Sequence, residues 1–127
     1  MRPVTAVTEW NGNLVIGGNI TQVSDLPVNR IALWNGSNWE ALGTGVNNTV
    51  QVLGVYEGDL IAGGAFTTAG GVTVNRIARW DGADWAPFGD GFNSTVWAFT
   101  TFGTALVAGG QFTTSGGTTV NRVALWN

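Results

Sequence analysis

The chain repeats one 46-residue unit without a gap, and this repeat constrains the fold more than any other feature of its 127 residues. Residues 4–49 match residues 50–95 at 18 of 46 positions, and residues 96–127 match the second unit at 16 of the 32 positions they share. Because matching positions of a repeat face matching environments, we expect one structural unit built two and three-quarter times. The most regular markers are Asn29-Arg30, Asn75-Arg76 and Asn121-Arg122; Gly17-Gly18, Gly63-Gly64 and Gly109-Gly110; and Trp34, Trp80 and Trp126.

Each unit divides into four short strand-like segments separated by turn signals. The glycine pair inside the second segment predicts a close backbone approach or a β-bulge. Asn-Gly or Asp-Gly between the third and fourth segments predicts a hairpin. In the second unit the predicted strands cover residues 50–56, 60–67, 74–80 and about 85–89.

The first predicted strand is apolar on both faces. Alternation along it places Val50, Val52 and Tyr56 on one face and Leu53 and Val55 on the other. A strand that is apolar on both sides is typical of one sandwiched between neighbouring sheets. The first strand of each unit is therefore expected to lie inside a stack of sheets.

Four antiparallel strands in a unit of this length are typical of a β-propeller blade, whose repeats run to about 40 to 50 residues. We therefore predict an all-β propeller with about three four-stranded blades in a single repeat domain, 1–127. A β-sandwich is the alternative fold, although it does not require a gapless repeat. The predicted boundaries are 4–49 for blade 1, 50–95 for blade 2 and 96–127 for a partial blade 3 that lacks its fourth strand.

Two strings carry a resemblance to a known repeat family: Val-Asn-Arg-Ile-Ala-Arg-Trp-Asp-Gly-Ala-Asp-Trp-Ala-Pro-Phe-Gly-Asp-Gly at 74–91 and Ala-Gly-Gly-Ala-Phe-Thr-Thr-Ala-Gly-Gly at 62–71. They resemble the kelch-like propeller repeats of large bacterial secreted proteins and of fungal cell-surface cortical markers. Unit one departs from the pattern at 21–27, where the Ala-Gly-Gly loop is replaced. The resemblance implies a scaffold or interaction module at the cell surface or outside the cell, with no shared catalytic residues.

The composition excludes several classes of function. The chain has no lysine, no histidine and no cysteine, and its net charge is −3. Nucleic acid and anionic membranes are bound by clustered cations, so neither is an expected partner. Without cysteine or histidine we expect no metal site, no cofactor and no enzymatic activity. The sequence shows neither an apolar membrane-spanning run nor a signal-peptide pattern, and the cellular location stays open.

The third unit ends inside the hairpin that would lead to its fourth strand. Propellers close with about four to eight blades, and an open arc leaves the apolar flanks of its end blades in water. We expect the ring to close by self-association, as a homodimer with six blades or, as the alternative, a trimer with nine. Edge-to-edge pairing through 120–126, an edge without lysine, is a second hypothesis. A fragment or engineered piece of a longer propeller is the other interpretation.

The recurrent arginines are candidate ligand-binding residues. Arg30, Arg76 and Arg122 could grip anionic ligands around a ring. Residues fixed in every repeat usually serve the repeat itself, so hydrogen bonding within the blade is the favoured interpretation.

Tryptophan pairs flank the Asn-Gly and Asp-Gly hairpins, at Trp34 with Trp39 and at Trp80 with Trp85. The spacing Trp-Asp-Gly-x-x-Trp is similar to that of small fucose-binding propeller lectins, and this resemblance implies aromatic stacking on sugar rings. A cross-strand tryptophan pair is equally a way to pin a hairpin.

The paired carboxylates are expected to be turn residues. Asp81 with Asp84, and Glu57 with Asp59, sit beside glycine in turns, where aspartate is ordinary. The function predicted from the sequence is therefore a non-enzymatic, self-associating scaffold or binding module for a protein or glycan ligand. A carbohydrate-binding lectin is the alternative.

Overall fold

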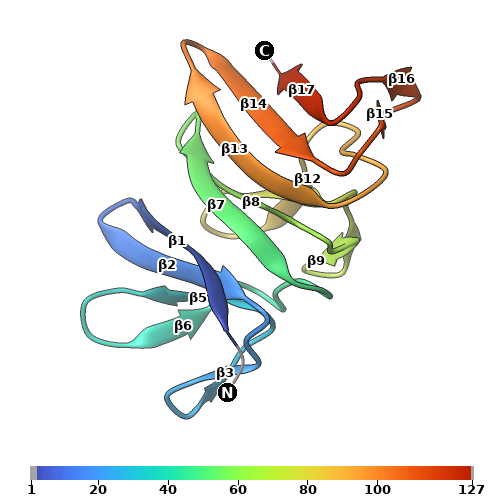
Figure 1. Ribbon diagram of the computed structural model, residues 1–127. Coiled ribbons are helices and arrows are strands. Elements are labelled where there is room, and N and C mark those ends of the chain that lie inside the picture. Colours follow the sequence, from blue (N-terminus) through green and yellow to red (C-terminus); the bar gives the residue numbers. More distant parts are fainter. Residues whose placement is uncertain (1–2, 127) are drawn as a thin grey trace.

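The computed structural model describes residues 3–126, and every regular element within them is a β-strand. Each repeat unit forms one main antiparallel sheet and one small two-stranded hairpin. In Figure 1 the three main sheets fan out in chain order, with β7 in contact with β1 on one side and with β13 on the other. The predicted all-β class is confirmed. In the described part of the chain no helix is long and apolar enough to cross a membrane.

The strand order runs straight through each main sheet. The first sheet contains β1 (Val4–Trp10), β2 (Asn13–Gly18), β5 (Ile31–Trp34) and β6 (Trp39–Ala41). The second contains β7 (Val50–Tyr56), β8 (Asp59–Gly64), β11 (Ile77–Trp80) and β12 (Trp85–Pro87). The third contains β13 (Val96–Phe102), β14 (Ala105–Gly110) and β17 (Val123–Trp126). The hairpins are β3 (Gln22–Val23) with β4 (Leu26–Pro27), β9 (Thr68–Ala69) with β10 (Val72–Thr73), and β15 (Thr114–Ser115) with β16 (Thr118–Thr119).

The glycine pair and a β-bulge occur together, as the sequence predicted. In the second sheet the pairing register shifts between Val50 and Val52, opposite Gly63 and Gly64. The same shift recurs in the first and third sheets. A Cβ atom at Gly64 would press against the carbonyl oxygen of Thr49, so only glycine fits beside the bulge.

The bulge also overturns the predicted alternation in the first strand. Val50 packs toward the first sheet, where its Cγ1 would lie 2.7 Å from a Cβ atom at Gly17. Val52 instead packs beside Val96, toward the third sheet. The prediction that Val50 and Val52 share a face is wrong, because the extra residue Gln51 inverts the phase of the alternation.

The second and third predicted strands are shorter than expected. Strand β8 ends at Gly64 and β11 begins at Ile77, immediately after Arg76, whose φ of 69° is incompatible with a strand. The hairpin β9–β10 fills the interval, closed by Gly70 and Gly71 with φ of 57° and 81°. The first unit forms the same hairpin without a glycine pair.

The core lies between successive sheets rather than inside any one of them. The cluster between the first and second sheets is the larger, and aromatic side chains lock each sheet to the next. Trp10 Nε1 donates to the carbonyl of Gly58 at 2.9 Å, and the hydroxyl of Tyr56 donates to the carbonyl of Thr104 at 2.7 Å. Fully buried members of the two inter-sheet clusters include Ile31, Leu60, Phe66, Ile61 and Ile77.

Candidate functional site

The recurrent arginines adopt a left-handed backbone conformation at the same place in each unit. Their φ angles are 70° at Arg30, 69° at Arg76 and 73° at Arg122. The backbone N–H of Arg76 donates to the carbonyl of Phe66, and its carbonyl accepts from the N–H of Gly64, both at 3.0 Å. Equivalent bonds form in the other two units. The backbone of each arginine therefore joins the glycine pair to the hairpin that follows it.

Two of the arginine side chains border equivalent shallow pockets between successive sheets. The pocket beside Arg30 has a volume of about 260 Å³ and the one beside Arg76 about 320 Å³. Arg76 Nη1 donates to the carbonyl of Phe92 at 3.4 Å, whereas the buried Nε of Arg30 has no hydrogen-bond partner among the residues that the structure describes. Arg122 lines neither pocket. The other polar residues lining them are Asn29, Thr44, Asn47 and Thr68 in the first, and Asn75, Asp90, Asn93 and Thr114 in the second.

The asparagine side chains that line these pockets form hydrogen bonds with the backbone of the chain. Asn93 Oδ1 accepts from the N–H groups of Thr113 at 2.8 Å and Thr114 at 3.2 Å, which fastens the second unit to the hairpin of the third. Asn75 Nδ2 donates to the carbonyl of Asp90 at 3.1 Å. The guanidinium of Arg76 and the carboxylate of Asp90 are the two charged groups that the larger pocket offers to a ligand. Asp90 was missed in the sequence because the first unit has threonine at its position.

The tryptophan pairs are built into the sheets. The ring centroids of Trp80 and Trp85 lie 5.2 Å apart, and those of Trp34 and Trp39 lie 5.3 Å apart. Trp80 and Trp85 are buried, and Trp85 Nε1 donates to the carbonyl of Leu42 in the first sheet at 2.8 Å. Trp34 and Trp39 are half-buried. Protein therefore covers the rings of the second pair, and none of the four lines the pockets beside Arg30 and Arg76.

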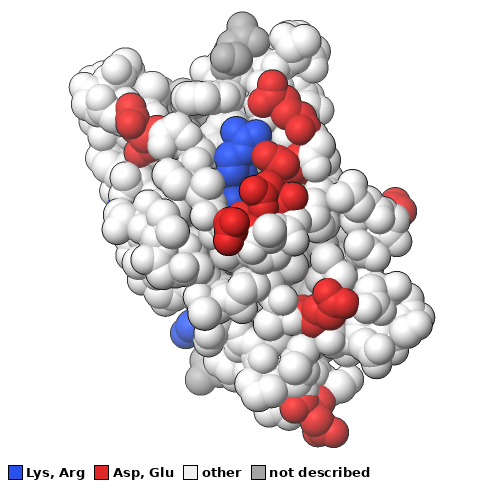
Figure 2. Space-filling view, turned by 180° about the vertical axis from the view of Figure 1, so that it is seen from behind, with Lys and Arg blue, Asp and Glu red and all other residues white. Residues whose placement is uncertain are grey.

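One pair of carboxylates serves an ion pair. Arg79 Nη2 lies 3.0 Å from Asp59 Oδ2 and 3.8 Å from Glu57 Oε1, and its guanidinium sits 5.3 Å from the ring centre of Phe88. Figure 2 shows basic atoms directly beside acidic atoms on a face that is otherwise mostly uncharged. Within residues 3–126 no three histidine, cysteine, aspartate or glutamate side chains gather where they could hold a metal ion.

The other pair shapes a turn. The N–H groups of Asp84 and Ala83 each donate to Asp81 Oδ1 at 2.8 Å, and these bonds lower the pKa of the Asp81 carboxyl because they favour its charged form. Asn35 makes the same turn in the first unit, accepting from Asn38 N–H at 2.8 Å. Since the neutral Asn35 accepts the same two backbone hydrogen bonds, the turn requires a side-chain oxygen and not a charge.

The outward face of the third sheet is apolar. Phe102 is 75% exposed, although the equivalent Tyr56 is 5% exposed under the third sheet. Val123 is 60% exposed, whereas its counterpart Ile77 is 1% exposed. Side chains that the repeat buries between sheets therefore face solvent here.

The outward face of the first sheet also exposes apolar side chains whose counterparts in the second sheet are buried. Val7 is 61% exposed and its counterpart Leu53 only 8%. Leu14 is also exposed, whereas the equivalent Leu60 is fully buried against the first sheet. Apolar side chains that the repeat buries elsewhere are thus exposed on both end sheets, and exposed apolar surface is a feature of interaction sites.

The family comparison supports the repeat type. Residues 58–81 match a family model described as "Domain of unknown function (DUF5122) beta-propeller". The matched segment covers β8, the β9–β10 hairpin and β11. No curated protein matches the chain. Over this segment the chain is similar to a β-propeller repeat. The comparison confirms neither the resemblance to kelch-like repeats nor the resemblance to fungal cortical markers.

Proposed function

We propose that the chain is a run of three propeller blades that works as a non-enzymatic scaffold or binding module and completes its ring by self-association. Blades 1, 2 and 3 correspond to residues 4–49, 50–95 and 96–127. The propeller match and the small antiparallel sheets support a binding or scaffold module. A fold alone does not define a ligand, so the proposal rests on surfaces of this chain.

The observation that carries the proposal concerns the outward faces of the first and third sheets. They expose apolar side chains at the repeat positions that are buried where one sheet packs on the next inside the chain. The second sheet buries Leu53 and Leu60 against the first, and the first sheet exposes Val7 and Leu14 at the same repeat positions. The first sheet of one copy can therefore pack on the third sheet of another as the second packs on the first. Two chains joined head to tail supply six blades, within the range of about four to eight that close a ring.

Light scattering tests this proposal. At micromolar concentration we expect the mass of a dimer, with a trimer as the alternative closure. We expect Gly109→Leu to reduce the particle to a monomer. A Cβ atom at the equivalent Gly63 would lie 3.0 Å from Val96 Cγ1 in the next sheet, whereas at Gly109 the nearest atom, Arg122 O, is 3.7 Å away. The added side chain therefore fits an isolated third sheet but obstructs a copy docking on it.

Ser37→Leu is the matched control, because Ser37 is exposed in a hairpin turn of the first sheet and the same side chain is introduced there. We expect this variant to keep the wild-type mass. A wild-type monomer at every micromolar concentration, or a Gly109→Leu variant that stays a dimer, contradicts closure through the end faces.

Carbohydrate binding is a second candidate, favoured by the pairing of Arg76 and Asp90 in one pocket. A guanidinium and a carboxylate can together grip neighbouring sugar hydroxyls. We expect a glycan array to show binding that Arg76→Ala removes and that Trp34→Ala, away from the pocket, retains. A uniformly blank array at high protein concentration eliminates this candidate.

A further inference from the structure

The pockets beside Arg30 and Arg76 occupy equivalent places in the repeat but differ in charge. The position that is Thr44 in the first pocket is Asp90 in the second. Among the described residues that line it, the first pocket therefore has one charged side chain, that of Arg30, and no carboxylate. The residues that the two pockets share are Asn29, Asn47 and Thr68 in the first, and Asn75, Asn93 and Thr114 in the second.

The guanidinium of Arg30 is not neutralised by the protein. Within residues 3–126 it forms no ion pair, and its Nε is buried without a hydrogen-bond acceptor. Arg76 differs, because its Nη1 donates to the carbonyl of Phe92 at 3.4 Å. A buried N–H without an acceptor costs free energy. Because this N–H has already lost its water, pairing with an anion costs Arg30 less desolvation than it would cost a fully solvated arginine.

The backbone fixes the position of Arg30. Its N–H donates to the carbonyl of Ile20 at 2.8 Å, and its carbonyl accepts from the N–H of Gly18 at 3.0 Å. These bonds tie the root of the side chain to β2 and to the segment that leads into the β3–β4 hairpin. A ligand therefore meets a guanidinium whose backbone is already ordered, which lowers the entropic cost of binding.

The remainder of the pocket suits a ligand that carries hydroxyl groups. The pocket has a volume of about 260 Å³, and Thr44 and Thr68 line it. Its asparagines are bonded within the chain, since Asn29 Nδ2 donates to the carbonyl of Thr44 at 2.9 Å and Asn47 Oδ1 accepts from the N–H of Thr68 at 3.1 Å. A ligand in this pocket therefore meets one cation and the hydroxyl-bearing side chains of two threonines.

We propose that the pocket beside Arg30 binds the carboxylate of an acidic sugar, such as a uronic acid. A guanidinium pairs with a carboxylate through parallel charge-assisted hydrogen bonds, which are roughly twice as strong as neutral ones. The threonine hydroxyls bond to the hydroxyls of the sugar ring. The pocket lies between the first and second sheets of one chain, so the inference depends neither on ring closure nor on the sugar site beside Arg76.

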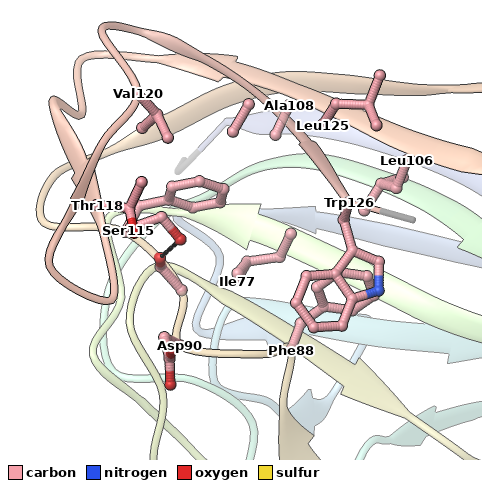
Figure 3. A pocket seen from close by; sticks show the side chains of 13 residues that line it. Ile77, Phe88, Asp90, Leu106, Ala108, Ser115, Thr118, Val120, Leu125 and Trp126 are labelled. Atoms are coloured by element: carbon pink, nitrogen blue, oxygen red, sulfur yellow. Dashed lines mark hydrogen bonds between the residues drawn. The ribbon is translucent and has the colours of Figure 1, made fainter.

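Asp90 makes the equivalent pocket unsuitable for an acidic group. In Figure 3 its carboxylate points away from the apolar side chain of Ile77, and a Cβ atom at Gly116 in the next hairpin would press against it. Arg76 and Asp90 line one pocket, but the two described side chains form no ion pair with each other. The carboxylate of Asp90 repels a second carboxylate, so we expect acidic sugars to prefer the pocket beside Arg30.

Titration with sodium glucuronate, followed through the arginine Nε–H signals in ¹⁵N NMR, tests the inference. We expect a saturable shift of the Arg30 signal with a dissociation constant on the order of 1 mM, as for one ion pair and a few hydrogen bonds. We expect the Arg76 signal to stay in place. No saturable shift at Arg30 overturns the proposal.

Two further ligands separate the charge from the hydroxyl groups. Glucose has a hydroxymethyl group in place of the carboxylate and is expected to leave the Arg30 signal unchanged. Hexanoate has the carboxylate without the hydroxyls and is expected to bind roughly three- to tenfold more weakly than glucuronate. Glucose or hexanoate binding as tightly as glucuronate overturns the proposal.

Arg30→Gln removes the positive charge and is expected to weaken glucuronate binding at least roughly tenfold. The backbone N–H signals of Val46 and Asn47, which border the pocket, report binding in this variant. Arg122→Gln is the matched control, because Arg122 has the same left-handed backbone but lines neither arginine pocket. We expect it to bind as the wild type does. An Arg30→Gln variant that binds as tightly as Arg122→Gln overturns the proposal.

Exchanging the residue that distinguishes the two pockets tests the role of charge. Thr44→Asp introduces a carboxylate and is expected to weaken glucuronate binding roughly three- to tenfold at low ionic strength. Asp90→Thr removes one and is expected to make the Arg76 signal shift with glucuronate. Both residues are exposed, so both variants are expected to keep the fold. Wild-type behaviour of both variants overturns the proposal.

Discussion

Replacing Trp85 with alanine is expected to lower the free energy of unfolding by about 3 to 5 kcal/mol, the range for a large aromatic residue removed from a core. The indole fills the space between the first and second sheets, and its N–H satisfies the carbonyl of Leu42. Truncation leaves a cavity and removes one of the two hydrogen bonds that the Leu42 carbonyl accepts, the other coming from the backbone N–H of Gly45 at 3.1 Å. Urea denaturation followed by circular dichroism measures the change.

Two controls separate these contributions. Trp85→Phe keeps the ring and loses the donor, so we expect a cost nearer 1 kcal/mol from the hydrogen bond, plus a smaller packing loss. Trp39→Ala changes the equivalent position of the first sheet, where the side chain is only half-buried, and is expected to cost less than Trp85→Ala. Equal losses at Trp39 and Trp85 would show that the inter-sheet contact does not stabilise the chain.

Gly64→Ala is expected to destabilise the chain by about 3 kcal/mol, the upper end of the range for overpacking a core. The new methyl would press on the Thr49 carbonyl and lie 3.0 Å from the backbone nitrogen of Gln51. Backbone atoms on both sides of a bulge cannot move aside without breaking the pairing of β7 with β8. Thermal unfolding of the variant beside the wild type measures the effect.

Gly109→Ala is the matched control in β14, which is the strand of the third sheet equivalent to β8. Within one chain its nearest neighbour would be Arg122 O at 3.7 Å, an ordinary contact, so in the monomer, where no second copy covers Gly109, we expect a change of at most about 0.5 kcal/mol. A Gly64→Ala variant as stable as Gly109→Ala would mean that the bulge relaxes freely. The glycine pair would then need another explanation.

The elements that the sequence predicted well are those whose signals are local and repeated. The bounds of β7 match the predicted first strand, 50–56, and β1 and β13 occupy the equivalent positions of their units. The Asp81-Gly82 turn lies in the expected hairpin. The β9–β10 hairpin was missed although Gly70-Gly71 is a turn signal, because an apolar run on each side suggested two longer strands. The predicted phase of β7 was wrong because the glycine pair marks the second strand, whereas the extra residue of the bulge, Gln51, lies in the first strand and no residue type marks it there.

The candidate site was harder to predict, since exposure depends on what the next sheet covers. The Trp80 and Trp85 rings were candidates for sugar stacking, yet the first sheet and its Leu42 carbonyl enclose them. The backbone role of Arg76 follows from its positive φ, which could not be predicted from the sequence because arginine rarely adopts this conformation. The difference in charge between the two equivalent pockets became visible only once the structure showed which residues line them.

The aromatic residue at the end of the first strand of each sheet, Trp10, Tyr56 or Phe102, contributes to the contact with the following sheet. Trp10 and Tyr56 each donate a hydrogen bond to the turn between the first two strands of the following sheet, but Phe102 has no polar side-chain atom to donate. In a closed ring of two chains, each interface between chains would therefore lack the side-chain hydrogen bond that links neighbouring sheets within a chain. Exchange of subunits between assembled rings would begin at the interfaces between chains, while the three sheets within each chain stayed packed together.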